Sequence, residues 1–462
     1  MKILLLASEC APIAKVGGLA DVIGSLPQSL KEIGADVSLA IPFYSAIKKS
    51  VKNPKLVQKD IPVYFEGRKK TFNLWQTNLS DSSVPLFLIE NEKYFGGEGI
   101  YIETDASSGG SKQEAARFLF LSVAALKIAQ LFKIEILHCH DWHVGIVPFL
   151  VKKNNLKIKT VFTIHNLGYQ GLYHQDIVNQ LLGTDFTQEV NCLILGILNA
   201  DILTTVSPNY AKEILTPEFG FGLEVYLKQR EKDLVGILNG LDEKVFNPEL
   251  DSFIRKNYSS RNFGAKTENK IHLQNVTFGR SSPEIPIISI VSRLAPQKGM
   301  DLVQKIFPLL LGENLQFVLL GKGIPEYEEF FKEMAKKFPE KFWAKIDFDE
   351  NLAHQIYAGS DIFLMPSLYE PCGLGQLIAM KYGTIPVARA VGGLKDTIFP
   401  QKTGFLFEKY DSQEFFETIK SALNFFENKK IWKKLQENAI KQDFSWKKSA
   451  KEYLRVYQKA LG

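Results

Sequence analysis

The sequence predicts an α/β protein with two Rossmann-like, doubly wound domains, in which parallel sheets are covered by helices on both faces. Three observations support this prediction. The chain has 462 residues, more than one hydrophobic core usually serves. Short, continuously apolar segments recur along it, as expected of strands buried on both faces. Helix-like segments separate many of these strands, and this alternation is typical of parallel sheets.

The apolar segments expected to form strands are bounded by Gly, Asp, Asn or Ser. They are 2–8, 36–43, 85–90, 136–141, 159–166, 202–207, 234–240, 286–294, 315–323, 361–367 and 384–390. Between them, residues 19–34 and 114–132 show the apolar spacing of helices. Polar residues directly after these strands are candidate site residues, because doubly wound sheets bind ligands at the carboxyl ends of their strands.

The alternation of strands and helices breaks between about Asn247 and Glu284. This stretch is polar and leads into a Ser-Ser-Pro-Glu-Ile-Pro turn. We place a domain boundary near the start of this stretch. The prediction is an N-terminal domain over 1–245 and a C-terminal domain over 246–440. Residues 441–462 contain an amphipathic helix, which we expect to pack back on the N-terminal domain.

Composition narrows the class of protein. The net charge of +5 is spread along the chain without a dense basic stripe, so no nucleic-acid partner is expected. No apolar segment approaches the ~20 residues that span a bilayer, so no membrane partner is expected. The four cysteines are far apart and form no Cys-x-x-Cys pair, which favours a reducing compartment. The apolar start is too short for a signal peptide, so we expect a cytoplasmic protein.

Two glycine-rich turns repeat the pattern Gly-Gly-Leu-x-Asp, one in KVGGLADV from Lys15 and one in VGGLKDTI from Val391. Glycine lets backbone N–H groups approach an anion closely, and a helix that begins there adds its positive end. Glycines at such positions can also serve only to make the turn. A lysine precedes the first turn, and this cation strengthens the anion-binding interpretation.

The segment SRLAPQKG places Arg293 and Lys298 in a loop directly after a predicted strand. Two cations five residues apart suit a diphosphate better than a single carboxylate. The alternative is a solvated loop with ordinary salt bridges. Further on, PSLYEPCGLGQL turns through Glu370 and opens a helix, where the N–H groups of Leu374 and Gly375 could meet a phosphate. Glu370 could hold the hydroxyls of a polyol there, or could act only as a helix cap.

Two motifs raise the question of a metal. HCHDWH contains His138, His140 and His143, but its Asp141 lies one place too early for the His-x-His-x-Asp-His pattern of metallohydrolases. The segment DFDE, residues 347–350, matches the Asp-x-Asp pattern with which some glycosyltransferases hold a divalent ion. Lysines, an arginine and backbone amides already balance a diphosphate here, so neither a metal nor a cofactor is expected.

Seven motifs occur in a fixed order from Lys15 to Thr397: KVGGLADV, HCHDWH, TIHNLGYQG, NGLDEKVFNP, SRLAPQKG, PSLYEPCGLGQL and VGGLKDTI. None is specific alone, but together they cover nearly the whole chain. In this combination the chain resembles the bacterial glycogen synthase and plant starch synthase family, whose members are retaining glycosyltransferases with the two-domain GT-B fold.

The resemblance implies transfer of glucose from ADP-glucose, with UDP-glucose as the alternative donor, to the non-reducing end of an α-1,4-glucan. The active site would lie in a cleft between the domains, with the nucleotide on the second. The implied catalytic residues are Asp141, His165, Arg293, Lys298 and Glu370. The implied substrate-binding residues are Lys15, Gly17, Gly18, Asp21, Tyr94, Asn166, Asn239, Phe348, Cys372, Gly373, Leu374, Gly375, Gly392, Gly393 and Leu394.

The sequence also departs from the family pattern. Gly96 and Gly97 stand where a charged pair is usual, Ile324 where an aspartate is frequent, and Ile378 where the wider superfamily often has a second glutamate. Three other functions stay open at this point. They are a retaining glycosyltransferase with another donor or acceptor, a non-catalytic protein that binds glucan or nucleotide sugar, and a metallohydrolase.

Overall fold

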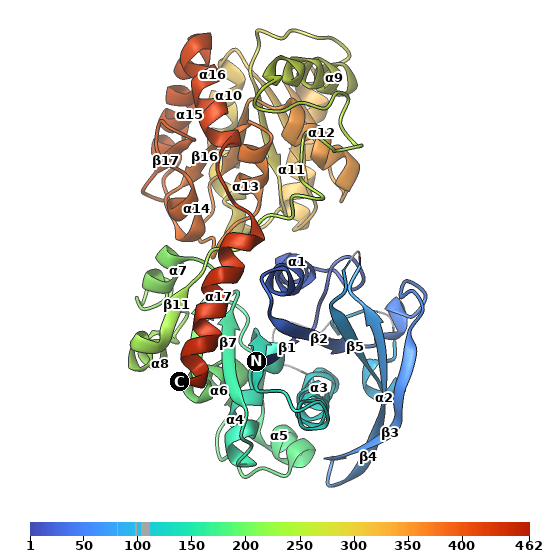
Figure 1. Ribbon diagram of the computed structural model, residues 1–462. Helices are drawn as coiled ribbons and strands as arrows, with labels where there is room; N and C mark the ends of the chain where they lie inside the picture. The colour runs from blue at the N-terminus through green and yellow to red at the C-terminus, as the bar shows by residue number, and fades with distance from the viewer. Residues whose placement is uncertain (81, 98, 103–110) are drawn as a thin grey trace. The chain divides into compact units, whose positions relative to one another are not determined.

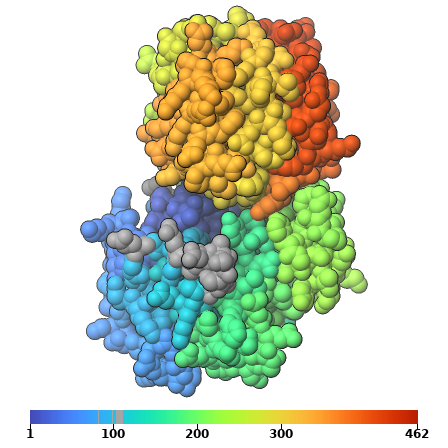
Figure 2. Space-filling view, turned by 180° about the vertical axis from the view of Figure 1, so that it is seen from behind, coloured from blue at the N-terminus to red at the C-terminus, as the bar shows by residue number. Residues whose placement is uncertain are grey.

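The computed structural model describes residues 1–80, 82–97, 99–102 and 111–462, which fold into two compact units (Figure 1). The N-terminal unit comprises Met1–Gly240 and Trp446–Gly462, and the C-terminal unit comprises Leu241–Ser445. The divisions therefore fall after residues 240 and 445, whereas the sequence places them after 245 and 440. Figure 2 shows the molecular surface from behind, coloured by residue number as in Figure 1.

The N-terminal unit is built on a nine-stranded sheet in the order β11-β10-β7-β6-β1-β2-β5-β4-β3. Its strands are β1 (Lys2–Leu6), β2 (Asp36–Pro42), β3 (Lys55–Phe65), β4 (Arg68–Asn78), β5 (Pro85–Glu90), β6 (Ile136–His140), β7 (Lys159–Ile164), β10 (Ile202–Thr205) and β11 (Leu234–Gly236). All neighbouring strands are parallel except the pairs β3/β4 and β4/β5. The two-residue strands β8 (Leu172–Tyr173) and β9 (Val190–Asn191) form a separate antiparallel pair.

Helices cover this sheet and connect its strands. They are α1 (Gly18–Glu32), α2 (Glu92–Phe95), α3 (Lys112–Leu131), α4 (Val147–Lys153), α5 (Gln175–Leu182), α6 (Cys192–Asn199), α7 (Pro208–Glu213), α8 (Glu224–Gln229) and α17 (Trp446–Leu461). The C-terminal helix α17 packs against α1 and β7 (Figure 1). Its buried face contains Trp446, Tyr453 and Tyr457, so the last helix belongs to the core of the N-terminal unit.

The C-terminal unit has a six-stranded, all-parallel sheet in the order β14-β13-β12-β15-β16-β17. Its strands are β12 (Ile287–Val291), β13 (Gln316–Leu320), β14 (Phe342–Lys345), β15 (Ile362–Met365), β16 (Ile385–Arg389) and β17 (Phe405–Phe407). Its helices are α9 (Lys266–Phe278), α10 (Met300–Gly312), α11 (Pro325–Lys337), α12 (Glu350–Gly359), α13 (Gly375–Lys381), α14 (Gly392–Thr397), α15 (Ser412–Glu427) and α16 (Lys429–Ile440). Central strands such as β13 and β15 are buried along their whole length.

The predicted α/β architecture is confirmed, and each of the eleven predicted strands contains a strand of the structure. Six strands were not predicted: β3, β4, β8, β9, β14 and β17. The hairpin of β3 and β4 lies at the edge of its sheet, and β3 is largely exposed, so it lacks the continuous apolar run of a buried strand. The other four strands that were not predicted are only two to four residues long.

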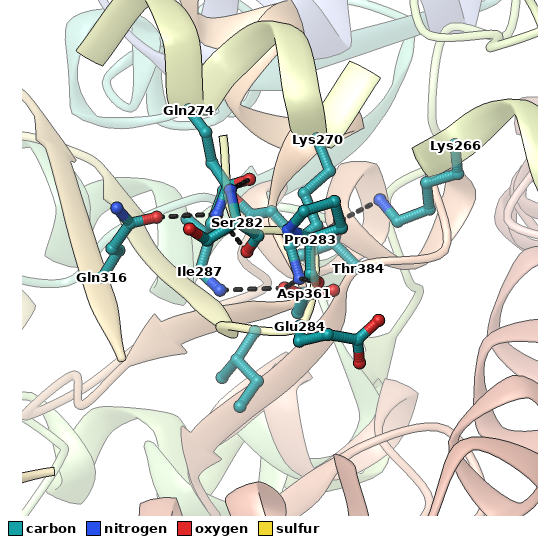
Figure 3. Close-up of polar contacts among 12 residues, drawn as sticks. Lys266, Lys270, Gln274, Ser282, Pro283, Glu284, Ile287, Gln316, Asp361 and Thr384 are labelled. Carbon is teal, nitrogen blue, oxygen red and sulfur yellow. Dashed lines mark hydrogen bonds and ion pairs between the residues drawn. The ribbon is translucent and has the colours of Figure 1, made fainter. Parts of the chain in front are cut away.

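The polar stretch 247–284, predicted as a boundary region without regular structure of its own, contains helix α9. Its buried residues are almost all polar: Lys266, Asn269, Lys270, Leu273, Gln274 and Thr277. Figure 3 shows three of them directed at the starts of neighbouring strands and at the 282–284 turn. Lys270 Nζ lies 2.8 Å from Asp361 Oδ2, and Gln274 Nε2 donates to Gln316 Oε1 at 2.7 Å. Apolar periodicity cannot reveal a helix that is buried through hydrogen bonds and an ion pair.

Candidate active site

The C-terminal unit gathers its candidate residues where the chain order of its sheet reverses, between β12 and β15. In an open α/β sheet this reversal leaves a crevice at the carboxyl ends of the strands, and ligands bind there. The loop after β12 contains Arg293 and Lys298, and the loop after β15 contains Glu370. The structure therefore brings together cations and a carboxylate that lie far apart in the sequence.

Lys298 and Glu370 form the centre of this site. Lys298 Nζ lies 2.6 Å from Glu370 Oε2, and the Ser367 hydroxyl donates to the same oxygen at 3.0 Å. The Glu370 side chain is only 6% exposed, whereas Lys298 is 19% exposed. Helix α13 begins after Leu374 without a side-chain cap, so Glu370 is not its cap. A buried carboxylate paired with a more accessible lysine is suited to bind hydroxyls and an anion side by side.

Arg293 is joined to this centre through Gln297, a residue that the sequence analysis did not single out. The guanidinium Nη2 of Arg293 donates to Gln297 Oε1 at 3.1 Å. The backbone carbonyl of Gln297 accepts from Leu368 N at 2.9 Å, two residues before Glu370. Gln297 thus ties the cation-bearing loop to the carboxylate-bearing loop. Gln297 could have been selected from the sequence as a candidate site residue, because it lies between the two cations of SRLAPQKG.

The second glycine turn packs directly against the turn that carries Glu370. A Cβ atom on Gly392 would lie 1.9 Å from the carbonyl oxygen of Glu370, and the φ angle of Gly392 is 45°. The N–H of Gly393 donates to the same carbonyl at 3.1 Å. These two glycines are therefore required for close packing, and the Gly393 amide already has a partner within the unit. Leu394 is fully buried.

The loop from Cys372 to Gly375 connects β15 with α13. Gln376 Nε2 donates at 3.0 Å to the carbonyls of both Cys372 and Gly373, and Gly373 has a φ of 77°. A Cβ atom on Gly375 would lie 3.0 Å from the ring of Phe363. The backbone of this loop is held from within the unit, which gives its amides fixed positions.

Phe348 lies between β14 and α12, and its side chain is 78% exposed. The two aspartates beside it have structural partners. Asp349 caps α12 by accepting from Leu352 N and pairs with Lys345 Nζ at 2.6 Å, and Asp347 accepts from Phe348 N at 2.8 Å. Within the described part of the chain, no group of three or more His, Cys, Asp and Glu side chains is arranged to hold a metal ion.

In the N-terminal unit, the chain order reverses between β6 and β1, and Asp141 follows β6 with a φ of 63°. Its Oδ1 accepts from His165 N at 3.2 Å, which joins the ends of β6 and β7. Burial raises the pKa of Asp141 to about 7, and the charge of Glu9 adds to this effect. Asp141 therefore changes charge near neutral pH, as functional carboxylates in clefts often do.

The histidines of HCHDWH have separate roles. His138 is buried between Tyr457 of α17 and the Thr163 hydroxyl, at 2.7 Å and 2.6 Å, so it joins the C-terminal helix to the sheet. His140 Nδ1 lies 3.0 Å from His165 Nε2. Burial lowers the pKa of His138, His143 and His165 to about 3 and that of His140 well below its usual value. All four imidazoles are therefore neutral at pH 7.

The first glycine turn contains Lys15, whose Nζ lies 2.7 Å from Asp21 Oδ1 in helix α1. Beyond Gly17 and Gly18 there is open space where a side chain would stand. The N–H of Gly17, however, donates to the carboxylate of Glu9 at 2.8 Å. The sequence analysis did not consider Glu9, although a carboxylate shortly after the first strand was a signal for it.

Three further predicted contacts lie in the N-terminal unit. Tyr94 is buried, and its ring stacks on Phe120 with a centroid distance of 4.2 Å. Asn166 Oδ1 accepts from Gly168 N at 2.9 Å within its turn. Asn239 is buried after β11, and its Oδ1 has no hydrogen-bond partner among the residues that the structure describes. A buried oxygen without a hydrogen-bond partner is a candidate to accept a hydrogen bond from a ligand.

Comparison with known proteins is consistent along the whole chain. Residues 2–229 match the family described as "Starch synthase catalytic domain", and residues 278–442 match "Glycosyl transferases group 1". The glycogen synthase of Thermosipho melanesiensis is 40% identical, with 100% of this chain and 99% of that protein covered. The glycogen synthase of Bacillus subtilis is 41% identical, with 99% and 98% covered.

Solved structures agree with these relatives. The catalytic domain of starch synthase IV from Arabidopsis thaliana, bound to ADP and acarbose, superposes with a TM-score of 0.90. It is 32% identical and covers 100% of this chain and 99% of its own. Sucrose-phosphate synthase from Thermosynechococcus elongatus has a TM-score of 0.65, covers 100% and 99%, and at 17% identity shares the fold alone. No helix of the described residues is both long and apolar enough to cross a membrane.

Proposed function

Because this chain belongs to the glycogen synthase and starch synthase family of retaining GT-B hexosyltransferases, we propose that ADP-glucose is its donor and an α-1,4-glucan its acceptor. Glucose is transferred to the non-reducing end of the glucan, with retention of configuration. The observation that carries the proposal is the buried Glu370 paired with Lys298 at the switch point of the C-terminal sheet. A relative of known structure is described as bound to ADP, which supports ADP-glucose over UDP-glucose.

The cations of the C-terminal unit act on the leaving group. When the glycosidic bond to the nucleotide breaks, negative charge concentrates on the β-phosphate. Arg293 and Lys298 are fixed by Gln297 and Glu370, so they neutralise this charge without reorganisation. Preorganised stabilisation of this kind often contributes more to catalysis than any other effect, and removing one donor typically costs ~3 kcal/mol in the barrier. Glu370 binds and orients the glucose hydroxyls.

The N-terminal unit supplies groups for the sugar. We assign Asp141 to a hydroxyl of the donor glucose. His165 is neutral because its pKa is about 3, so the imidazole adds no positive charge that would oppose charge developing at the anomeric carbon. Its backbone carbonyl and side chain stabilise that charge. No carboxylate is assigned as a covalent nucleophile, and a same-face ion-pair route accounts for retention.

The remaining assignments concern the nucleotide diphosphate. We assign Lys15 to the leaving phosphate as the cation of the first glycine turn. Phe348 stacks on the nucleotide base, and its 78% exposure leaves the ring available for this role. The four cysteines are free and buried, so we infer a cytoplasmic location, where thiols stay reduced.

The deciding experiment offers the protein ADP-glucose and UDP-glucose in separate reactions with glycogen. We expect incorporation of glucose from ADP-glucose into glycogen and at least tenfold less from UDP-glucose at equal concentration. Incorporation from UDP-glucose alone would replace the donor assignment. Absence of incorporation from either donor, with the protein folded, would overturn the proposed function.

A further inference from the structure

We propose that Glu9 is a positioning residue for the donor site, because its carboxylate fixes the backbone of the first glycine turn and thereby sets the place of Lys15. This inference rests on the proposed function in assigning Lys15 to the leaving phosphate. It adds a residue that acts on the reaction only through another residue.

The contacts of Glu9 are those of a built-in anchor. Glu9 is 4% exposed and lies three residues after β1, at the centre of the nine-stranded sheet. Its Oε2 accepts from the N–H groups of Val16 and Gly17, both at 2.8 Å. These amides directly follow Lys15 in the chain. A rigid strand thus determines the path of the turn through two short hydrogen bonds.

The other oxygen of Glu9 reaches a second loop. Glu9 Oε1 accepts from the hydroxyl of Tyr101, which also lies 3.3 Å from Ser8 Oγ. The preceding part of this loop is held by Arg117, whose guanidinium donates to several backbone carbonyls. These are the carbonyls of Tyr94 (3.1 Å), Gly96 (3.0 Å), Gly99 (3.1 Å) and Ile100 (2.6 Å). Arg117 therefore holds the described backbone around Gly96 and Gly97, which replace the usual charged pair, and Tyr101 links this loop to Glu9.

Glu9 is unsuited to contact the donor itself. Both of its oxygens already accept from groups of the protein, and a negative charge placed on a diphosphate would be repulsive. Gly17 was predicted to bind substrate, but its N–H donates to Glu9 Oε2. For the phosphate this turn offers the Lys15 ammonium, which also pairs with Asp21, and the N–H groups of Gly18 and Leu19 at the start of α1; the Ala20 N–H already donates to Gly17 O at 3.1 Å.

The test is a double-mutant cycle between Glu9 and Lys15. Glu9→Ala should lower kcat/KM for ADP-glucose at least tenfold, whereas Glu9→Gln, which keeps an oxygen for the two amides, should stay within threefold. In a Lys15→Ala background, Glu9→Ala should cost less than twofold, because residues that act as one unit are not additive. Full additivity in the cycle, or unchanged kinetics of Glu9→Ala in an active protein, would overturn the inference.

A matched control removes a similar anchor elsewhere in the same sheet. Asp201 Oδ2 accepts from the Thr160 backbone N–H and hydroxyl at 2.8 Å and 2.9 Å, at the opposite ends of the strands. Asp201→Ala should change kcat/KM less than twofold. If Glu9→Ala does not fold, Tyr101→Phe takes its place in the cycle. Tyr101→Phe should lower kcat/KM two- to fivefold when Lys15 is present, and it should not lower kcat/KM in the Lys15→Ala background. Equal losses in the two backgrounds would contradict the inference.

A second measurement does not depend on activity. Hydrogen exchange of the Val16 and Gly17 amides should become at least tenfold faster in Glu9→Ala and stay unchanged in Asp201→Ala. If the wild-type protein transferred no glucose, the proposed function would fail while this measurement still tested the anchor. Unchanged exchange in Glu9→Ala would remove the anchor whatever the activity.

Discussion

Lys298 and Glu370 are 72 residues apart in the chain, yet Lys298 Nζ lies 2.6 Å from Glu370 Oε2. The pair spans the loops after β12 and β15, the two neighbouring strands at which the chain order of the C-terminal sheet reverses. If the proposed substrate roles of both residues hold, the pair couples the stability of the site to its function, because each residue also neutralises the other.

Replacement of Lys298 should affect both properties. We expect Lys298→Ala to lower kcat at least tenfold, because the cation proposed to neutralise the leaving phosphate is lost. It should also destabilise the protein by about 2 kcal/mol, because the buried Glu370 loses its partner. Adding Glu370→Gln should recover the stability but not the activity. Denaturant unfolding and glucose incorporation measure the two effects, and unchanged kinetics of Lys298→Ala would remove it from the site.

Arg293 and Arg280 are both exposed arginines of the C-terminal unit, and Arg280 serves as the control for substitution of Arg293. Arg293→Ala should reduce the rate at least tenfold without lowering the melting temperature, because the Arg293 side chain is exposed. Arg280, also in the C-terminal unit, pairs only at the surface with Glu340 at 3.2 Å, and Arg280→Ala should leave the rate unchanged. Equal rates for the two variants would contradict the diphosphate assignment.

Asp141 should show opposite effects on stability and activity. Burial raises its pKa to about 7 in the folded protein, above its value when unfolded. The folded state therefore binds an extra proton between about pH 4 and 7, and stability falls as the pH rises through this window. Asp141→Asn should raise the free energy of unfolding at pH 8 by at least about 1 kcal/mol.

The same substitution should impair transfer. The wild-type kcat/KM should rise with pH through about 7, as Asp141 ionises and becomes a stronger acceptor for a glucose hydroxyl. In Asp141→Asn this rise should disappear and kcat/KM should be at least tenfold lower at pH 8. A variant that keeps both the rise and the rate would place Asp141 outside the substrate site.

Lys266 predicts a pH dependence of stability that is unrelated to the active site. Its Nζ is buried and donates to Ala358 O at 2.8 Å and to Thr384 Oγ1 at 2.8 Å. Lys266 and Thr384 are labelled in Figure 3. Burial lowers its pKa to about 7, so the unfolded state binds more protons between pH 7 and about 10. Stability from this group therefore rises with pH across that window.

Unfolding by denaturant at pH 7.5 and 9.5 measures this effect. The Lys266→Met variant should lose about 2 kcal/mol of the wild-type increase between the two pH values. Lys256 provides a control on an exposed side chain, and Lys256→Met should retain the increase. An identical pH profile for wild type and Lys266→Met would contradict the low pKa of Lys266.

Metal removal tests the two aspartates of DFDE. Asp349 already caps α12 and pairs with Lys345, so we expect EDTA to change the rate of transfer less than twofold. Mg²⁺ added in excess of the chelator is the control. A complete loss of activity in EDTA that is reversed by Mg²⁺ would restore a metal-binding role for DFDE or HCHDWH.

Much of the fold could be predicted from local pattern. Continuous apolar runs marked the eleven strands, because a strand of a covered parallel sheet must be apolar on both faces. The edge hairpin of β3 and β4 and the very short strands were not predicted, because they lack a long, continuous apolar run. Helix α9 was not predicted, because Lys270 and its neighbours bury polar groups against Asp361 and Gln316. Apolar periodicity reports burial only where burial is hydrophobic.

For the candidate site, the residues at strand ends could be predicted from the sequence, because strand and turn signals are local. The family could be predicted as well, since seven motifs occur in order. The tertiary structure selects which of these residues meet. It paired Glu370 with Lys298, turned His138 toward Tyr457 of α17, and gave the Gly17 amide to Glu9. The partner of a polar side chain depends on the order of strands in the sheet, and no single segment of the chain contains that information.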